Sequence, residues 1–323
     1  MVRQLLVRLL DVCWREPKMI CAYYSLGRFP QKTSSCTYRN IFMVDGRVGH
    51  GGMFDRLKGA ISVYAVSKIQ GKAFKINFTY PFRLEDYLEP NNYDWRIPPE
   101  AVTFSFPDAR PLFLYGECYS PDRLFKNRKC ESHFYYGYDS LREINVRYGT
   151  TFDWGELYRE LFKPTAYLQK SINHYKKDIG KDYIAIHTRF LNLLGDKMET
   201  DINPELPGRG KEKLIAKIET EVNRIANEHG DVRILLASDS MTFIHYMQER
   251  YPFVYVVPGT VKHVDTAGKT TNDENLKMFL DYYLISSAVK VYNIVADGMW
   301  PSAFPEYAAK IGGVPFERRI EFG

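Results

Sequence analysis

The chain has 323 residues, of which 45% are hydrophobic and 26% are charged, and its formal net charge is +5. This composition excludes a disordered or collagen-like protein, and the length suffices for one large domain or for two of ordinary size. The charge excess is too small and too evenly spread for a dedicated nucleic-acid-binding protein. A small anionic ligand or an anionic membrane surface is compatible with it.

The cysteines and the first residues bear on the compartment. The odd number of cysteines and the absence of a C-x-x-C pair predict neither a zinc site nor a disulfide framework, which favours a reducing, cytoplasmic compartment. The five are Cys13, Cys21, Cys36, Cys118 and Cys130. Arg3 and Arg8 interrupt the leucines of residues 1–10, so this stretch is too short to span a bilayer. We expect a helix that packs on its domain, and the alternative is an interfacial helix that holds the protein peripherally on a membrane.

A strand, a glycine loop and a helix follow one another after residue 40. The apolar run 41–44 predicts a strand, and residues 45–52 form the glycine loop. A helix is expected from about Met53 to Gly71, because its apolar residues recur every three or four positions. A strand at 73–77 would complete a βαβ unit. Residues 80–155 contain many turn-forming residues, with extended runs at 102–106 and 111–115, and predict no definite topology.

The second half alternates helices and strands more regularly, as parallel α/β chains do. We expect helices at 165–175, 214–225, 241–250 and 275–287 and after Pro301, and strands at 183–188, 232–237, 253–256 and 289–292. The chain is therefore predicted to form two Rossmann-like α/β domains. Their expected ranges are 1–164 and 165–323.

Ligands of parallel sheets bind beyond the carboxyl ends of the strands, where helix amino termini attract anions. Four polar clusters are predicted at such ends, namely 45–56, 187–189, 238–240 and 297–304. Arg189 offers five donors in a rigid fork that suits a diphosphate, and His187 should point to the same face and bind a base or a phosphate. A surface or ion-pairing role is the commoner fate of such an arginine when it is considered alone.

Two further clusters carry weaker signals. Asp239 could accept hydrogen bonds from a guanine edge or a ribose hydroxyl, and the alternative is that it caps the helix beginning near Met241. Ser302 and the backbone N–H groups of Ala303 and Phe304 open a helix and could hold a phosphate, although helices begin in this way without a ligand too.

The four clusters, in this order, resemble the motifs of the fucosyltransferase superfamily. That superfamily includes the nodulation α-1,6-fucosyltransferase, the protein O-fucosyltransferases and the α-1,2-fucosyltransferases. The tripeptide 187–189 matches its H-x-R motif, whose arginine holds the GDP phosphates. Residues 51–57 are similar to its amino-terminal glycine loop, and 237–240 to its A-[TS]-D-[SD] segment, whose acid contacts the nucleoside. Residues 281–286 and 302–304 resemble its D-x-x-L-[LM]-S helix and S-x-F phosphate loop.

The resemblance implies a GT-B fold, in which two Rossmann-like domains face a central cleft, and the transfer of fucose from GDP-fucose with inversion. It implies donor-binding roles for His187, Arg189, Asp239, Ser302, Ala303, Phe304, Gly51, Gly52, Asp55 and Arg56. No metal cofactor is expected, and the sequence contains no D-x-D motif. Arg189 and helix-terminal N–H groups would then stabilise the departing GDP in place of a cation. The acceptor would be a glycan or a glycoconjugate.

An inverting transfer benefits from a general base, which the sequence does not single out. Our hypothesis is His50, since a histidine accepts a proton near neutral pH. A packing role for this histidine is the alternative, and the rival bases are Asp45, Asp55, Asp196 and Glu199.

Other functions stay open at this stage. A GT-B transferase with another sugar nucleotide would carry the same phosphate-binding pattern, and so would a non-catalytic glycan- or nucleotide-binding protein. An NAD-linked oxidoreductase is disfavoured, because Asp55 stands where the third glycine of G-x-G-x-x-G is required.

Overall fold

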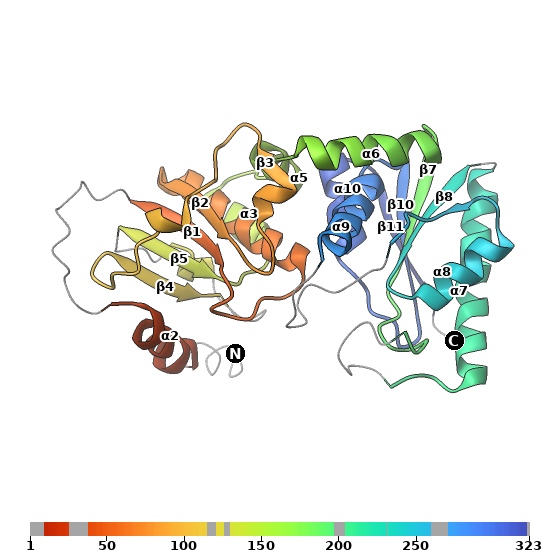
Figure 1. The fold of residues 1–323 in the computed structure, drawn as a ribbon, viewed down its shortest axis with the longest axis horizontal. Helices are drawn as coiled ribbons and strands as arrows, with labels where there is room; N and C mark the ends of the chain where they lie inside the picture. Colours follow the sequence, from red (N-terminus) through yellow and green to blue (C-terminus); the bar gives the residue numbers. More distant parts are fainter. Residues whose placement is uncertain are drawn as a thin grey trace. The chain divides into compact units, whose positions relative to one another are not determined.

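The structure, a computed structural model, describes residues 10–25, 38–114, 121–125, 130–196, 204–230, 232–259 and 271–321. The chain divides into two compact units, Met1–Lys163 and Pro164–Gly323. Each unit is built around its own sheet of parallel strands, with helices against the sheet faces (Figure 1). The predicted α/β class is therefore confirmed.

The sheet of the first unit has the strand order β2-β1-β5-β4. These strands are β1 (Arg39–Val44), β2 (Ala73–Phe78), β4 (Ala109–Phe113) and β5 (Glu131–Tyr135). Helix α3 (Met53–Gln70) connects β1 to its parallel neighbour β2, as the sequence predicts. The extended run at 102–106, for which no topology was predicted, forms no regular strand and has an isolated bridge from Ser105 to Ser25. A separate pair of short strands joins β3 (Leu88–Pro90) to β6 (Phe162–Pro164).

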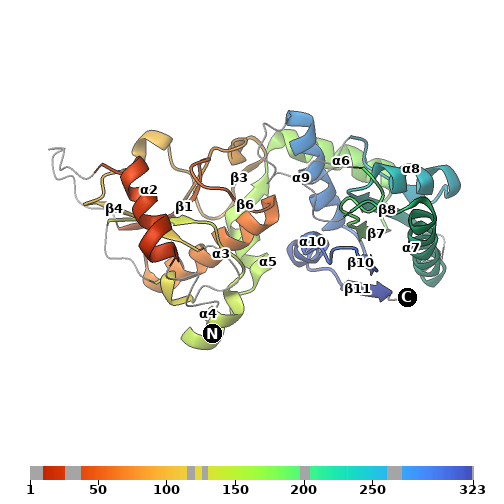
Figure 2. The same cartoon turned by 90° about the horizontal axis from the view of Figure 1, so that it is seen from below.

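Helices cover both faces of this sheet. Helix α3 lies on one face and contacts α4 (Leu141–Tyr148) and α5 (Trp154–Leu161). Helix α2 (Glu16–Tyr23) lies against the opposite face, where Met19 joins a core with Ile41 and Tyr135 (Figures 1 and 2). This helix was not predicted, and the helix expected within residues 1–10 is a different segment. Residues 1–9 lie outside the described residues, and Leu10 is exposed.

A buried polar chain runs beneath α2. The hydroxyl of Tyr24 lies 2.7 Å from Nδ1 of His133, and Nε2 of the same ring lies 2.9 Å from Oε2 of Glu131. Arg39 donates from Nε to Glu131 over 2.8 Å. Burial lowers the pKa of His133, so the neutral ring can accept from Tyr24 and donate to Glu131. These bonds tie the end of α2 to β5.

The sheet of the second unit has the order β11-β10-β7-β8-β9, and every pair of neighbours is parallel. The strands are β7 (Tyr183–Thr188), β8 (Arg233–Ser238), β9 (Val254–Tyr255), β10 (Lys290–Ala296) and β11 (Phe316–Glu321). Helices α7 (Gly208–His229) and α8 (Met241–Arg250) cover one face, and α9 (Asn272–Ile285) and α10 (Phe304–Gly312) cover the other (Figures 1 and 2). Helix α6 (Ala166–Ile179) precedes β7, with Thr165 capping its first turn.

Alternate residues of β7 face the two helical layers. Ile184 and Ile186 pack in the core formed with α7 and α8. Tyr183 points the other way, because its hydroxyl donates to the carbonyl of Leu284 at the end of α9. The two-residue period of a strand therefore directs His187 toward α9 and α10.

The cysteines differ from expectation. Cys130 is disulfide-bonded, and its partner lies outside the described residues. Cys13 and Cys21 are free and exposed. The cysteine pattern did not signal this disulfide, and the pattern therefore no longer supports a reducing compartment. In the part of the chain that the structure describes, no helix has the length and apolar content needed to cross a membrane.

We predict that Gly312→Ala destabilises the second unit. A Cβ at this position would lie 1.8 Å from the carbonyl oxygen of Ser286, where α10 packs on the end of α9. Relief of such a clash requires backbone movement, which we expect to cost about 1 to 3 kcal/mol. Urea unfolding of the two proteins measures the loss. Gly208→Ala is the control, because nothing lies within 4 Å of its Cβ, and an equal loss in both variants would refute the explanation.

Candidate active site

Three of the four predicted clusters meet at one edge of the second sheet. Strand β7 lies between β8 and β10, with His187 opposite Ala237 and Asn293. The carboxyl ends of these parallel strands therefore bring residues 187–189, 238–240 and 297–304 together. The fourth cluster, the glycine loop, belongs to the first unit.

His187 is buried at the end of β7. Its ring stacks on that of Phe304 with the centroids 5.4 Å apart, so the structure joins two residues that were predicted separately. Burial, with smaller effects from Arg189 and Lys277, lowers the pKa of His187 to about 3. The ring is therefore neutral at physiological pH. Its Nδ1 is buried and has no hydrogen-bond partner in the described part of the chain.

Arg189 directly follows β7 and is half-buried. Its carbonyl oxygen accepts a hydrogen bond of 3.1 Å from the N–H of Trp300. The preceding residue, Thr188, donates from its hydroxyl to Ser238 over 2.9 Å. These bonds fix the backbone at Arg189 between β8 and the loop after β10, which is the position that the sequence predicts for a phosphate-binding arginine.

A polar chain connects this strand end to the start of α10. Asn293 donates from Nδ2 to the carbonyl of His187 over 3.1 Å and accepts from Nε of Arg318 at 3.0 Å. Arg318 also donates from Nη2 to the carbonyl of Ser302 over 3.1 Å. The hydroxyl of Ser302 accepts from the N–H of Phe304 at 3.2 Å. Ser302 precedes Ala303, the N-cap residue of α10, and its hydroxyl already binds the N–H group of Phe304.

Asp239 holds the loop that follows β7. Its two carboxylate oxygens accept from the N–H groups of Phe190 and Leu191, each over 2.8 Å. Leu191 has a φ of 56°, an unfavourable value for leucine that these bonds help to hold. The alternative that Asp239 caps α8 is wrong, because Ser240 does so by accepting from the N–H of Phe243.

Asp196 and Glu199 are two of the rival candidates for the general base. Asp196 accepts from the N–H of Thr242 at 3.0 Å and from its hydroxyl at 2.9 Å, and also from Ser240. It therefore stabilises the amino terminus of α8. Glu199 lies outside the described residues.

Asp281, from the predicted D-x-x-L-S helix, forms a buried ion pair with Lys277, while burial raises the pKa of its carboxyl group.

In the glycine loop, His50 is buried, and both ring nitrogens have no hydrogen-bond partner among the described residues. Its ring stacks on Tyr136 with the centroids 6.0 Å apart. Burial, helped by the charge of Arg56, lowers the pKa of His50 to about 3. Arg56 donates to the carbonyls of Gly51 at 2.9 Å and Tyr80 at 3.1 Å, and so holds the loop.

The remaining loop residues have structural contacts of their own. A Cβ on Gly51 would lie 2.9 Å from the hydroxyl of Tyr136, so glycine permits this close approach. Gly52 occupies the N-cap position of α3. Asp55 accepts from Nζ of Lys58 at 2.7 Å, and Asp45 forms an ion pair with Arg47. Neither aspartate is thus a free carboxylate that would mark the base.

Sequence reasoning missed Asn293, Arg318 and Lys277. Asn293 carried a usable signal, because a polar residue inside the apolar run of β10 needs a buried partner. Arg318 could not have been recognised in this way, since the several charged residues of β11 also suit an exposed edge strand.

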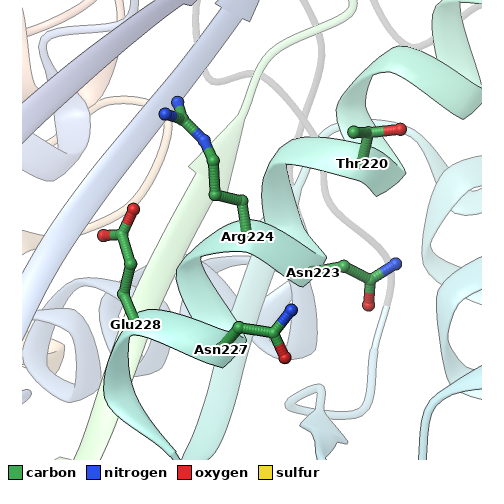
Figure 3. A pocket seen from close by; sticks show the side chains of 5 residues that line it. All are labelled: Thr220, Asn223, Arg224, Asn227 and Glu228. Atoms are coloured by element: carbon green, nitrogen blue, oxygen red, sulfur yellow. The ribbon is translucent and has the colours of Figure 1, made fainter.

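A hollow on the outer face of α7 contains none of the predicted residues. Figure 3 shows its lining side chains, all from the second half of this helix, namely Thr220, Asn223, Arg224, Asn227 and Glu228. Because α7 returns from the carboxyl edge of the sheet to the start of β8, this half lies toward the amino ends of the strands. Among the described residues, no group of three or more His, Cys, Asp or Glu side chains is arranged to hold a metal ion.

The buried His187 predicts a pH dependence of stability. Its pKa is about 3 in the folded chain against 6.5 for the free group, so below pH 6.5 the unfolded chain binds a proton that the folded chain refuses. Stability must fall as the pH falls, by up to about 1.4 kcal/mol per pH unit for each such group. We expect His187→Phe to reduce this slope in urea unfolding between pH 6.5 and pH 4. His174→Phe, at an exposed position of α6, should keep it, and equal slopes in all three proteins would contradict the prediction.

Comparisons with known proteins bear on the fold. Neither the family models nor the curated protein sequences gave a match to this chain. Among solved structures, a point mutant of Arabidopsis thaliana FUT1 in complex with GDP has a TM-score of 0.57 at 14% identity, over 97% of this chain and 76% of that chain. NodZ α-1,6-fucosyltransferase co-crystallised with GDP has a TM-score of 0.54 at 14% identity, over 84% and 92%. NodZ soaked with GDP-fucose has a TM-score of 0.52 at 15% identity, over 85% and 92%. The predicted resemblance to the fucosyltransferase superfamily is thus confirmed for the fold, and the chain has the GT-B fold of these proteins.

Proposed function

We propose that the protein is a metal-independent, inverting glycosyltransferase that transfers fucose from GDP-fucose to a hydroxyl group of a glycan or glycoconjugate. One observation carries the proposal: His187, Arg189 and the loop 302–304 meet at the carboxyl edge of the second sheet, beside the amino terminus of α10. This arrangement suits an anionic nucleotide. The shared fold with fucosyltransferases crystallised with GDP or GDP-fucose supports the same donor.

The donor's diphosphate is the group that this edge binds. The guanidinium of Arg189 donates to the phosphate oxygens, and α10 adds the positive end of its dipole. When the acceptor oxygen bonds to the anomeric carbon, the bond from that carbon to the phosphate oxygen breaks and GDP leaves. Arg189 then balances the charge that develops on GDP. The same second unit, residues 165–323 of the predicted division, is the nucleotide-sugar-binding domain.

The nucleoside contacts come from His187 and Asp239. The neutral imidazole of His187 has an unpartnered Nδ1, which donates to or accepts from the ligand according to its tautomer. Each oxygen of Asp239 accepts one backbone hydrogen bond, and a carboxylate oxygen can accept more than one, so we assign a ribose hydroxyl or a guanine N–H to this side chain as well. Loss of Asp239 would also release the loop after β7, so its substitution affects both binding and folding.

The glycine loop belongs to the acceptor side of the proposal. The resemblance of residues 51–57 to the glycine loop of the fucosyltransferases assigns substrate contacts to Gly51, Gly52 and Asp55, and Arg56 keeps the loop in shape through its bonds to Gly51 and Tyr80. His50 is the proposed base. A pKa of about 3 makes it a weak proton acceptor as it stands, and a negative charge brought near it on substrate binding would raise that pKa.

Arg189→Ala should weaken GDP binding and slow GDP release from GDP-fucose. Loss of charged hydrogen bonds to a diphosphate is worth about 1.5 to 3 kcal/mol, or roughly tenfold to hundredfold in affinity. Calorimetry with GDP, UDP and ADP measures the affinity and the preference for the base, and a donor assay measures turnover. Arg189→Lys should recover only part of the affinity, because an ammonium group lacks the planar fork.

Arg250→Ala, at an exposed position of α8, is the matched control and should bind GDP like the unmodified chain. Undiminished GDP release by Arg189→Ala would remove the centre of the proposal. Preference for UDP or ADP would assign another sugar nucleotide. GDP binding without donor turnover in the presence of varied acceptors would assign a non-catalytic nucleotide-binding protein.

His50→Ala should lower turnover and leave the affinity for GDP close to that of the unmodified chain. A general base contributes roughly 10² to 10⁴ in rate, and its loss should remove the acidic limb of the pH–rate profile. His174→Ala controls for the loss of an exposed imidazole. Turnover of His50→Ala within a few-fold of the unmodified chain, with unchanged melting temperature, would exclude the role.

A further inference from the structure

Helix α2 and the residues just before it present an apolar stripe to solvent. Leu10 and Trp14 are 51% and 64% exposed, and Pro17 and Cys21 are exposed as well. These four positions are spaced by four, three and four residues, so they fall on one side of a helix. A π-helical turn at Asp11–Arg15 leads into α2 and joins the two halves of the stripe.

The opposite side of the same helix is firmly attached to the first unit. Met19 is buried in the core under the sheet face. Glu16 is buried and forms an ion pair with Arg123, with Arg110 also at 3.7 Å. Tyr24 then anchors the end of the helix to His133 at 2.7 Å. These contacts hold the helix on the first unit while its outer stripe is exposed. The exposure of the stripe therefore does not result from loose packing of the helix.

The charges around the stripe favour an anionic surface. Lys18 is exposed beside it, and Arg15 lies in the preceding turn. The burial of Glu16 in an ion pair with Arg123 removes one of the two acidic residues of positions 1–23 from the outer face. Of the described positions 10–23, two are basic, namely Arg15 and Lys18.

The size of the stripe argues against a second protein as its occupant. Stable protein interfaces bury about 800 Å² on each partner, whereas a stripe of four side chains on one helix offers at most a few hundred Å². Binding of a helix to a lipid surface does not require such a large buried area. Tryptophan prefers the boundary between headgroups and acyl chains, and basic residues beside it bind lipid phosphates.

We propose that α2 with its preceding turn is an interfacial helix that docks the first unit on an anionic lipid surface. Leu10, Trp14, Pro17 and Cys21 enter the boundary between headgroups and acyl chains, and Lys18 binds phosphate groups of the lipid. This site lies on the side of the first sheet opposite α3, and it does not depend on which reaction the protein catalyses.

Co-sedimentation of the full chain with vesicles tests the proposal. Vesicles that contain phosphatidylglycerol should bind the protein, and vesicles of phosphatidylcholine alone should bind it more weakly. The double variant Leu10→Ala/Trp14→Ala should lose roughly tenfold or more in vesicle affinity, because two apolar side chains no longer enter the lipid. Lys18→Glu should weaken binding to the anionic vesicles, and added salt should reduce its effect.

Tyr167→Ala provides the matched control, because Tyr167 is a large side chain that is 55% exposed on α6. It should bind vesicles like the unmodified chain, and all variants should melt at the same temperature, since the changed residues are exposed. In fluorescence, anionic vesicles should shift the emission to shorter wavelength, and Trp14→Phe should abolish this shift.

Two results would overturn the inference. One is equal vesicle binding by the double variant and the unmodified chain, which would assign any lipid affinity to another surface. The other is a chain that elutes as a dimer in the absence of lipid and becomes a monomer on Leu10→Ala/Trp14→Ala, which would assign the stripe to a second copy.

Discussion

The candidate site depends on the side chain of Arg318. Its guanidinium joins Asn293 in the centre of the sheet to the carbonyl of Ser302 at the start of α10. Asn293 continues the chain of bonds to the carbonyl of His187. Since each of these polar groups is wholly or partly buried, loss of one partner leaves others without a hydrogen bond and costs more than the bond itself contributes. The position of the proposed phosphate loop is therefore set by a residue of the last strand, 16 residues further along the chain.

In both units, a charged side chain near the strand ends forms hydrogen bonds with backbone carbonyl or N–H groups of a loop. Arg56 does so for the glycine loop, and Asp239 for the loop after β7. Such a device makes a loop rigid without a large apolar core beneath it. It also means that several residues that resemble ligand contacts in sequence have structural partners, and substitution of these residues tests two roles at once.

Much of the fold was predictable, because β1, α3 and most of the second unit follow simple apolar periodicity. The rest was not, and particular residues explain why. Strand β5 contains Glu131 and His133, whose polar side chains point into the network beneath α2, so the strand lacks an apolar pattern. Strand β11 also lacks an apolar pattern, because most of its residues are charged. At the site, Arg189 and His187 were placed correctly at the strand end, whereas the N-cap by Ser240 and the contacts of Asp239 depend on the loop after β7, whose path local sequence does not determine.

The bond between Tyr24 and His133 has a consequence for shortened forms of the protein. A chain that starts after residue 24 would lose the lipid-facing helix, but it would also leave Nδ1 of His133 without its partner and open the apolar core around Met19. If this shortened chain failed to bind lipid, the cause could be unfolding of the first unit as well as the loss of the surface. Such a deletion cannot separate where the protein resides from whether it folds, and point changes on the outer stripe can.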